Sequence, residues 1–215
     1  MGKPVTKLKS IEDTAIGLFA SQGIKQVTIK DIAKEAGCSE GALYRHYTGK
    51  DEMAWVLYSR EVKKFGGLLK GVLKGKGTYA ERLSSAVQLF YAFFDKDPVT
   101  FTFILLSEHN FPSHNRIDSQ INPHNLVFEF VDDGVKGGAF NIGDSNLGAA
   151  MVLGLVLQPA TLRATGKLKG RMGDKISDVV EACLRVLKVK DRRAAKARRR
   201  EDKESGVRSQ KSEEK

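Results

Sequence analysis

The sequence contains few of the residues that build disulfide frameworks or metal sites. Only two of its 215 residues are cysteines, Cys38 and Cys183, and both lie in apolar helical patterns, so we expect reduced thiols that act as small apolar fillers. Only four residues are histidines, and the spacing of His109, His114 and His124 does not place any two of them one helical turn apart. We therefore expect no metal ion and no other cofactor.

Long apolar runs and catalytic motifs are also absent. No run of about 18 apolar residues occurs, and the start, MGKPVTKLKSIEDT, has no apolar signal core, so we expect a cytoplasmic protein with no membrane-spanning segment. The sequence also lacks a nucleophile elbow, a phosphate-binding loop and paired catalytic carboxylates. These absences favour a binding protein over an enzyme.

The chain does have an excess of positive charge, and this excess lies at its two ends. The net charge is +10, of which residues 1–50 supply +3 (8 Lys/Arg, 5 Asp/Glu), residues 51–187 +1 (16 and 15) and residues 188–215 +6 (12 and 6). A basic surplus favours an anionic partner, most often nucleic acid. From Asp191 onward large apolar residues are almost missing, which predicts a disordered basic tail over 191–215. This tail either keeps the protein soluble or adds salt-dependent attraction to DNA.

Apolar residues recur with helical spacing along most of the chain, and this pattern predicts an all-α fold. Thr28 with Asp31, and Thr78 with Glu81, have the spacing of capping boxes that begin helices. Pro159 is expected to kink the helix that contains it. Helices are expected over about residues 10–22, 28–36, 39–47, 50–70, 78–94, 97–109, 122–137, 144–165 and 174–188, with a turn-rich loop at 111–123.

Residues 28–50 have the pattern of a helix-turn-helix. Gly37 supplies the sharp turn, while Leu43 and Tyr47 are expected to pack against the preceding helix, leaving one face of the following helix free for the major groove. Small residues near its start allow close approach to bases, and its tyrosine, histidine and lysine side chains can reach phosphates. The expected DNA-binding residues are Thr28, Lys30, Ser39, Glu40, Gly41, Ala42, Tyr44, Arg45, His46 and Lys50.

Two of these residues have more than one reasonable role. Glu40 can accept a hydrogen bond from a cytosine amino group, or it can tune specificity or simply face solvent. Arg45 can reach a base or a phosphate, or it can form a surface ion pair. Tyr44, His46 and Lys50 are expected on phosphates.

The same segment resembles the DNA-binding region of the tetracycline-repressor (TetR) family of bacterial transcription regulators. The matching runs are TIKDIAKEAGCS (28–39), GALYRHY (41–47) and Lys50. The resemblance implies a three-helix DNA-binding head, an all-helical body that binds ligand and dimerises, and repression that a small molecule relieves. The corresponding domains are 1–50 for the helix-turn-helix head and 51–190 for the ligand-binding and dimerisation body, followed by the basic tail.

The body contains a cluster of aromatic residues between positions 90 and 130. These rings either form a packed core or line an apolar ligand pocket. The resemblance favours the pocket, which would then take a mainly apolar ligand, with a few polar side chains to orient it. The expected ligand-binding residues are Phe90, Phe94, Phe101, Phe103, Glu108, His109, Phe128 and Gln158.

The segment 147–157 is apolar almost all round, so a helix there must be buried on more than one side, either within its own chain or against a second copy. The resemblance favours a homodimer built from the helices near 145–165 and 174–188. A two-fold dimer would read a palindromic double-stranded operator. The sequence thus predicts a dimeric repressor that a small-molecule effector releases from DNA. The alternative is a constitutive or architectural DNA-binding protein without an inducer.

Overall fold

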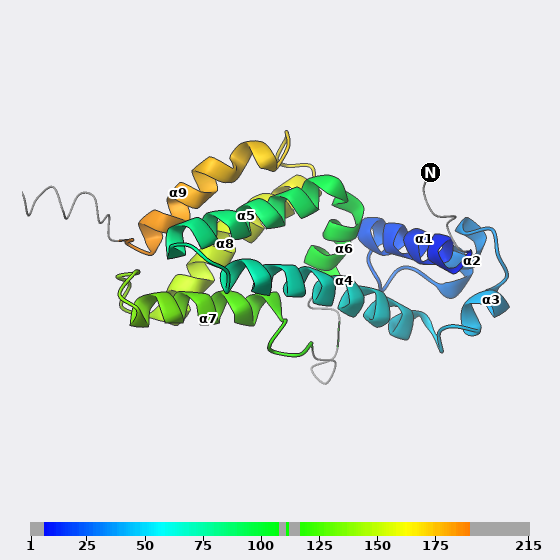
Figure 1. Ribbon diagram of the computed structural model, residues 1–215. Helices are drawn as coiled ribbons and strands as arrows, with labels where there is room; N and C mark the ends of the chain where they lie inside the picture. Colours follow the sequence, from blue (N-terminus) through cyan, green and yellow to red (C-terminus); the bar gives the residue numbers. More distant parts are fainter. Residues whose placement is uncertain (1–6, 108–110, 112–116, 190–215) are drawn as a thin grey trace, which may run out of the picture.

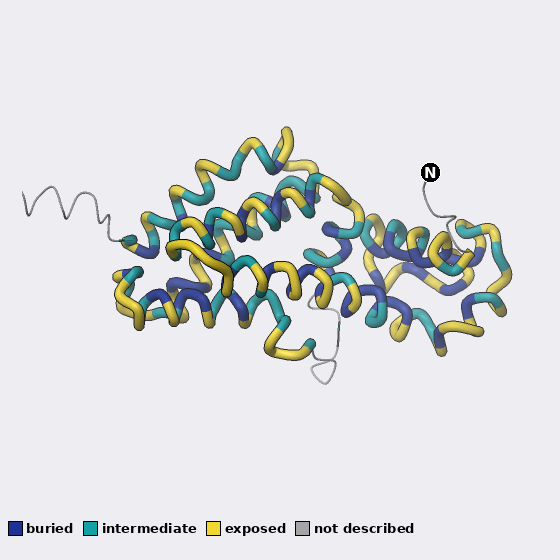
Figure 2. Tube along the Cα trace, viewed as in Figure 1, coloured by how far each residue is buried: buried dark blue, intermediate teal, exposed yellow. Residues whose placement is uncertain are grey.

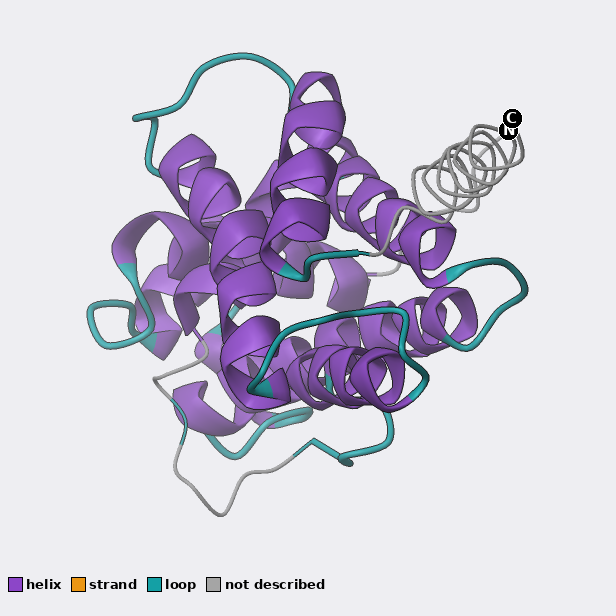
Figure 3. Ribbon diagram, turned by 90° about the vertical axis from the view of Figure 1, so that its left-hand side faces the viewer, coloured by secondary structure: helices purple, strands orange, loops and turns teal. Residues whose placement is uncertain are grey.

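The computed structural model describes residues 7–107, 111 and 117–189, and every regular element within them is a helix (Figures 1 and 3). The predicted all-α fold is therefore confirmed. A head of three helices is followed by a long helix that leads into a five-helix body. The elements are α1 (Lys7–Gln22), α2 (Ile29–Glu35), α3 (Glu40–Tyr44), α4 (Lys50–Leu73), α5 (Tyr79–Lys96), α6 (Pro98–Ser107), α7 (Pro123–Lys136), α8 (Ser145–Ala164) and α9 (Ile176–Val186), the last preceded by a 3-10 turn at Gly173–Lys175.

Two helices begin where the sequence places capping boxes, whereas the helix expected from residue 10 already begins at Lys7. Thr28 accepts a hydrogen bond from the backbone N–H of Asp31 (3.2 Å), and the Asp31 carboxylate accepts one from the backbone N–H of Thr28 (2.9 Å). The pair of Thr78 and Glu81 repeats this capping box at the start of α5. The hydrogen bonds from Thr28 hold the pKa of Asp31 below its ordinary value. Each box satisfies backbone N–H groups that a helix start leaves unpaired, which fixes where α2 and α5 begin.

The helix after the turn is shorter than the sequence predicts. α3 ends at Tyr44 instead of Tyr47, and Ser39 occupies its N-cap position although its side chain accepts no capping hydrogen bond. The backbone then tightens, because the N–H groups of His46 and Tyr47 both donate to the carbonyl of Leu43. This turn directs the ring of Tyr47 into the head, where it is 7% exposed.

Two hydrophobic clusters form the cores of the head and the body (Figure 2). The head cluster contains apolar residues of α1 to α3, but it also takes Met53, Leu57 and Val62 from the first half of α4 and Phe103 from α6. The sequence boundary at residue 50 coincides with the start of α4, whereas the packing of the head continues about three turns further along that helix. The head core is thus built jointly by the two parts of the chain.

α8 is only partly covered within one chain. It contacts α5, α6, α7 and α9, yet Leu147 and Met151 remain 50% and 42% exposed on one of its faces. By length and composition alone α8 could cross a membrane, a test that core helices of non-membrane proteins also pass. Pro159 lies inside α8, which continues to Ala164. The expected tail, Glu108, His109 and His114 lie outside the described residues.

Candidate DNA-binding face and ligand cavity

A buried carboxylate connects the head to α4. Glu12 of α1 is 7% exposed, and its two oxygens accept hydrogen bonds from the hydroxyl of Tyr47 (2.6 Å) and from the guanidinium of Arg60 (2.8 Å). Burial, and then the hydrogen bond to Glu12, raise the pKa of Tyr47. The phenol therefore stays protonated and continues to donate. Because Arg60 belongs to α4, this network ties the orientation of that helix to the end of the helix-turn-helix.

The residues expected to contact DNA lie mostly on the surface of the head. Tyr44 is 55% exposed, which is unusual for a large aromatic residue, and Arg45 and His46 beside it are also exposed. Among the remaining expected residues, only Ala42 and Lys50 are half-buried; the exposed ones are Thr28, Lys30, Ser39, Glu40 and Gly41. The predicted set thus lies on or next to α2 and α3, in the turn after α3 and at the first residue of α4.

Two of these residues already have partners inside the protein. The hydroxyl and backbone of Thr28 are bonded to Asp31 within the capping box, and the Lys50 ammonium donates to the carbonyl of Lys25 at 3.4 Å. The second contact is weak, so the lysine can leave it for a phosphate at little cost. Thr28 can approach a phosphate only while it also maintains the start of α2.

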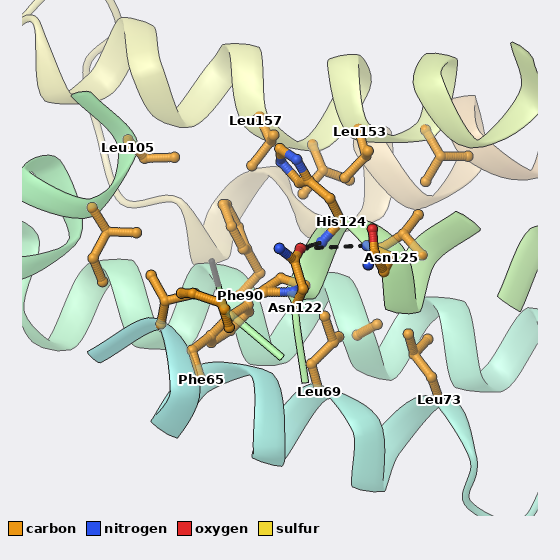
Figure 4. Close-up of a pocket in the computed structure, with 18 of the residues that line it drawn as sticks. Phe65, Leu69, Leu73, Phe90, Leu105, Asn122, His124, Asn125, Leu153 and Leu157 are labelled. Atoms are coloured by element: carbon orange, nitrogen blue, oxygen red, sulfur yellow. Dashed lines mark hydrogen bonds between the residues drawn. The ribbon is translucent and has the colours of Figure 1, made fainter. Parts of the chain in front are cut away.

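The body contains a partly open cavity of about 580 Å³ (Figure 4). This volume lies within the range of about 300–1,000 Å³ that is usual for small-molecule sites. The walls are provided by α4, α5, α6, α7 and α8 together with residues 117–122. They consist mainly of aliphatic and aromatic side chains: Trp55, Tyr58, Val62, Phe65, Leu69, Leu73, Leu83, Ala86, Val87, Phe90, Phe101, Ile104, Leu105, Phe111, Ile117, Pro123, Val127, Phe130, Val152, Leu153, Val156 and Leu157.

Among the described residues, the polar lining is concentrated in one short stretch, apart from the indole N–H of Trp55 and the hydroxyl of Tyr58. This stretch supplies Ser119, Asn122, His124 and Asn125, which lie at or just before the start of α7. The side-chain oxygen of Asn122 caps α7 by accepting from the backbone N–H groups of His124 and Asn125. In Figure 4 these residues lie between the leucines of α4 and those of α8. A mainly apolar cavity with polar residues gathered in one part of its lining suits an amphipathic ligand.

The structure places some of the expected ligand-binding residues in the lining of the cavity and others outside it. Phe90 and Phe101 line the cavity, whereas Phe94, Phe103, Phe128 and Gln158 do not. Phe94 packs edge-on against Phe101 from behind, and Phe103 is turned into the head cluster. Phe128 lies on the outer side of the body cluster, and Gln158 is exposed on α8.

The sequence reasoning missed the wall that α4 provides. Positions 55, 58, 62, 65, 69 and 73 all line the cavity and recur every three or four residues, so they form one stripe on that helix. The same spacing is visible in the sequence, but there it equally fits an ordinary core face. The prediction from sequence also missed the polar residues at the start of α7, because residues of these types are typical of a surface turn.

Comparison with known proteins identifies the head. Residues 11–54 match the family model for bacterial regulatory proteins of the tetR family. The head is a tetR-family domain. This match confirms the resemblance found in residues 28–50 and includes the whole helix-turn-helix together with the start of α4.

The rest of the chain has the fold of the same family. A bacterial regulatory protein of the tetR family from Rhodococcus RHA1 has a TM-score of 0.74 at 18% identity, covering 87% of this chain and 100% of that one. The transcriptional regulator FadR from Bacillus subtilis in complex with stearoyl-CoA has a TM-score of 0.68 at 21% identity, covering 82% and 97%. At these identities the structural matches show a shared fold.

A sequence relative covers most of the chain as well. The fatty acid metabolism regulator protein of Bacillus subtilis (strain 168) is 23% identical over 159 residues, which are 72% of this chain and 82% of that relative. The comparisons therefore show a tetR-family match over residues 11–54 and, over most of the chain, the helical fold of the similar regulators.

Proposed function

We propose that the protein is a dimeric repressor, without enzymatic activity, that binds an inverted-repeat operator and leaves it when a long, mainly apolar ligand enters the body cavity. Residues 1–50 would read DNA and residues 51–190 would bind the ligand and dimerise. The observation that carries the proposal is the combination of a tetR-family head with a large apolar cavity whose wall includes the helix leading out of that head.

The exposed face of the head supports binding to DNA. Tyr44 and His46 can donate to phosphates, and Lys50 can provide a positive charge at the start of α4. The small residues Gly41 and Ala42 allow α3 to approach base edges closely, and the alanine methyl group can contact a thymine methyl group. Phosphate contacts would position the head, while α3 would supply sequence preference.

The shape of the cavity supports a ligand with a long hydrocarbon chain. Its lining residues on α4 run from Trp55 to Leu73, a distance along the helix of about 27 Å at 1.5 Å per residue. The similar regulator FadR from Bacillus subtilis was solved with stearoyl-CoA bound. We therefore propose an acyl-CoA as the effector, with its acyl chain in the cavity and its polar part near Asn122 and His124.

Two of the body's contacts support coupling between ligand and DNA. α4 lines the cavity and also contributes to the head cluster, and α6 contacts α1 as well as α4, α5 and α8. A ligand that fits one arrangement of these helices better than another shifts the population towards it. Release of DNA then requires that DNA and ligand favour different arrangements, and the coupling must be reciprocal.

The exposed apolar face of α8 supports dimerisation. Leu147 and Met151 are one helical turn apart, and the half-buried residues of α9 continue the apolar surface beside them. Exposed apolar surface of this kind marks an interaction site. A two-fold dimer through α8 and α9 would place two heads on successive major-groove turns, about 34–36 Å apart.

Selection of bound sequences from a random DNA pool, followed by titration of the selected duplex with palmitoyl-CoA, tests the proposal. Enrichment of one inverted repeat and its release by palmitoyl-CoA are expected. Enrichment without release by any acyl-CoA would favour a regulator that lacks this inducer. Binding without sequence preference and with steep salt dependence would support the architectural alternative and overturn the repressor.

A further inference from the structure

The lining residues on α4 lie on both sides of the point where the polar lining meets that helix, and we call the two parts of the cavity beside them its arms. Gly66 marks the crossing point, because a Cβ atom there would lie 1.8 Å from the carbonyl oxygen of Ile121, so the chain just before α7 rests directly on the α4 backbone. Lys70 and Gln120 also meet across this crossing, at 3.4 Å. The polar lining begins at this point and continues into the first turn of α7.

The two arms of the cavity differ in length. Towards the body end, the lining residues on α4 stop at Leu73, about 10 Å from Gly66 along the helix axis. Towards the head they continue to Trp55, about 16 Å away. An extended hydrocarbon chain advances roughly 1.3 Å per carbon, given a carbon–carbon bond of about 1.5 Å. The short arm therefore accepts about eight carbons and the arm towards the head about twelve.

The end of the arm towards the head is a cluster of rings shared with the DNA-binding head. Trp55, Tyr58 and Phe111 line the cavity, with ring centroids 5.9 Å (Trp55–Tyr58), 5.3 Å (Trp55–Phe111) and 4.7 Å (Tyr58–Phe111) apart. Tyr58 then meets Phe103 of α6 edge-on at 6.4 Å, and Phe103 stacks on Phe19 of α1 at 5.8 Å. These last two rings are fully buried, so they cannot move independently of their neighbours.

We propose that the protein measures chain length: any acyl chain that fits the cavity binds, but only a chain that reaches Trp55 and Tyr58 displaces the ring cluster and releases DNA. This inference rests on the proposed acyl-CoA effector and adds to it a separation between binding and response. A short chain lies against apolar side chains of the body and does not reach Trp55 and Tyr58. A long chain must fill the arm towards the head, since the other arm cannot hold it, and there it competes with ring contacts that position α6 against α1.

The test compares octanoyl-CoA, lauroyl-CoA and palmitoyl-CoA on the full-length protein bound to its selected operator. Affinity is measured by calorimetry, and DNA release by fluorescence anisotropy at saturating ligand. We expect all three to bind and palmitoyl-CoA to lower DNA affinity by about 5- to 150-fold, the usual size of such coupling. Lauroyl-CoA, whose chain just reaches Trp55 and Tyr58, should lower it as well, and octanoyl-CoA should leave it unchanged while competing with palmitoyl-CoA. Emission of Trp55, the only tryptophan, should change with palmitoyl-CoA and not with octanoyl-CoA.

A pair of variants tests the path through the ring cluster. Phe103→Leu removes the ring between Tyr58 and Phe19 without altering the cavity lining, so palmitoyl-CoA should still bind while its effect on DNA affinity falls. Phe140→Leu is the matched control, since Phe140 is equally buried but packs on Tyr79 and Phe130 at the other end of the body. It should retain the full response.

The possible outcomes distinguish a failure of the length measurement from a failure of the proposed acyl-CoA effector. If octanoyl-CoA at saturation releases DNA as completely as palmitoyl-CoA, the length measurement is wrong while the proposed repressor stands. Equal loss of response in Phe103→Leu and Phe140→Leu would likewise overturn the path through the rings. If none of the three ligands binds, both the acyl-CoA effector and the length measurement fail.

Discussion

The hydroxyl of Tyr47 lies 2.6 Å from the buried carboxylate of Glu12, although the two residues are 35 positions apart in the sequence. This contact joins the turn after α3 to α1, and Arg60 on the other carboxylate oxygen extends it to α4. One carboxylate therefore adds a hydrogen-bonded link between the helix-turn-helix and the connecting helix to their hydrophobic packing.

Tyr47→Phe keeps the ring and removes only the hydroxyl. The loss of this hydrogen bond to the buried Glu12 carboxylate should destabilise the head by about 1.5–3 kcal/mol, the usual value for a hydrogen bond to a charged group. Urea unfolding followed by circular dichroism measures this loss. Tyr44→Phe is the control, because its hydroxyl lies on a ring that is 55% exposed. Equal stability of the two variants would show that Glu12 does not need the phenol.

Lys50→Ala should weaken binding to operator and unrelated DNA alike, because a phosphate contact carries no sequence information. The slope of log affinity against log salt should fall by about 1. Anisotropy titrations at several salt concentrations measure both. Lys63→Ala, an exposed lysine of α4 beyond the head, provides the charge-matched control. An equal change in the two variants would mean that Lys50 acts only through net charge.

Gly66→Ala should distort the cavity. Its new methyl group would lie 1.8 Å from a backbone oxygen of Ile121, so the segment that carries the polar lining must move away from α4. We expect weaker binding of palmitoyl-CoA and a lower melting temperature. Gly67→Ala is the matched control, because nothing lies within 4 Å of its Cβ position. It should stabilise the helix by about 0.5–1 kcal/mol. A Gly66→Ala protein that bound ligand normally would contradict the close packing.

Leu147→Glu should convert the dimer into monomers at micromolar concentration, since two charges would face each other on the exposed side of α8. Light scattering coupled to size-exclusion chromatography gives the mass directly. Leu68→Glu is the comparison, because Leu68 is equally exposed (50%) but lies on α4. If Leu68→Glu alone dissociates the dimer, the interface lies on α4 and the assignment to α8 is wrong.

Cys183 should resist alkylation in the folded protein. Burial raises the pKa of its thiol to about 11, so almost no thiolate is present at neutral pH. Iodoacetamide should label the partly exposed Cys38 first, and Cys183 only after unfolding, as read by peptide mass spectrometry. The protonated thiol should make its full contribution to the free energy of unfolding below the pKa of an unfolded thiol, about 8.5. This contribution should be lost as the pH rises towards 11. Rapid native labelling of Cys183 would mean that α9 opens readily.

The sequence by itself determined the features that depend on residues three or four positions apart. The capping boxes at Thr28 and Thr78 and the cap at Asn122 are such local features, and each begins a helix where expected. The helix-turn-helix was also readable, because its turn and its apolar positions lie within one short segment. The predicted fold class follows from these signals and is confirmed, and the resemblance to the family is confirmed over residues 11–54.

Only the tertiary structure decided which apolar residues line the cavity and which fill a core. α6 is apolar on all sides, so its periodicity cannot show that Phe101 faces the cavity while Phe103, two residues later, enters the head. The contact between Glu12 and Tyr47 and the crossing of the chain over Gly66 likewise join segments far apart in sequence. Such contacts depend on how whole helices pack, and a hydrophobic side chain gives the same sequence signal in either place.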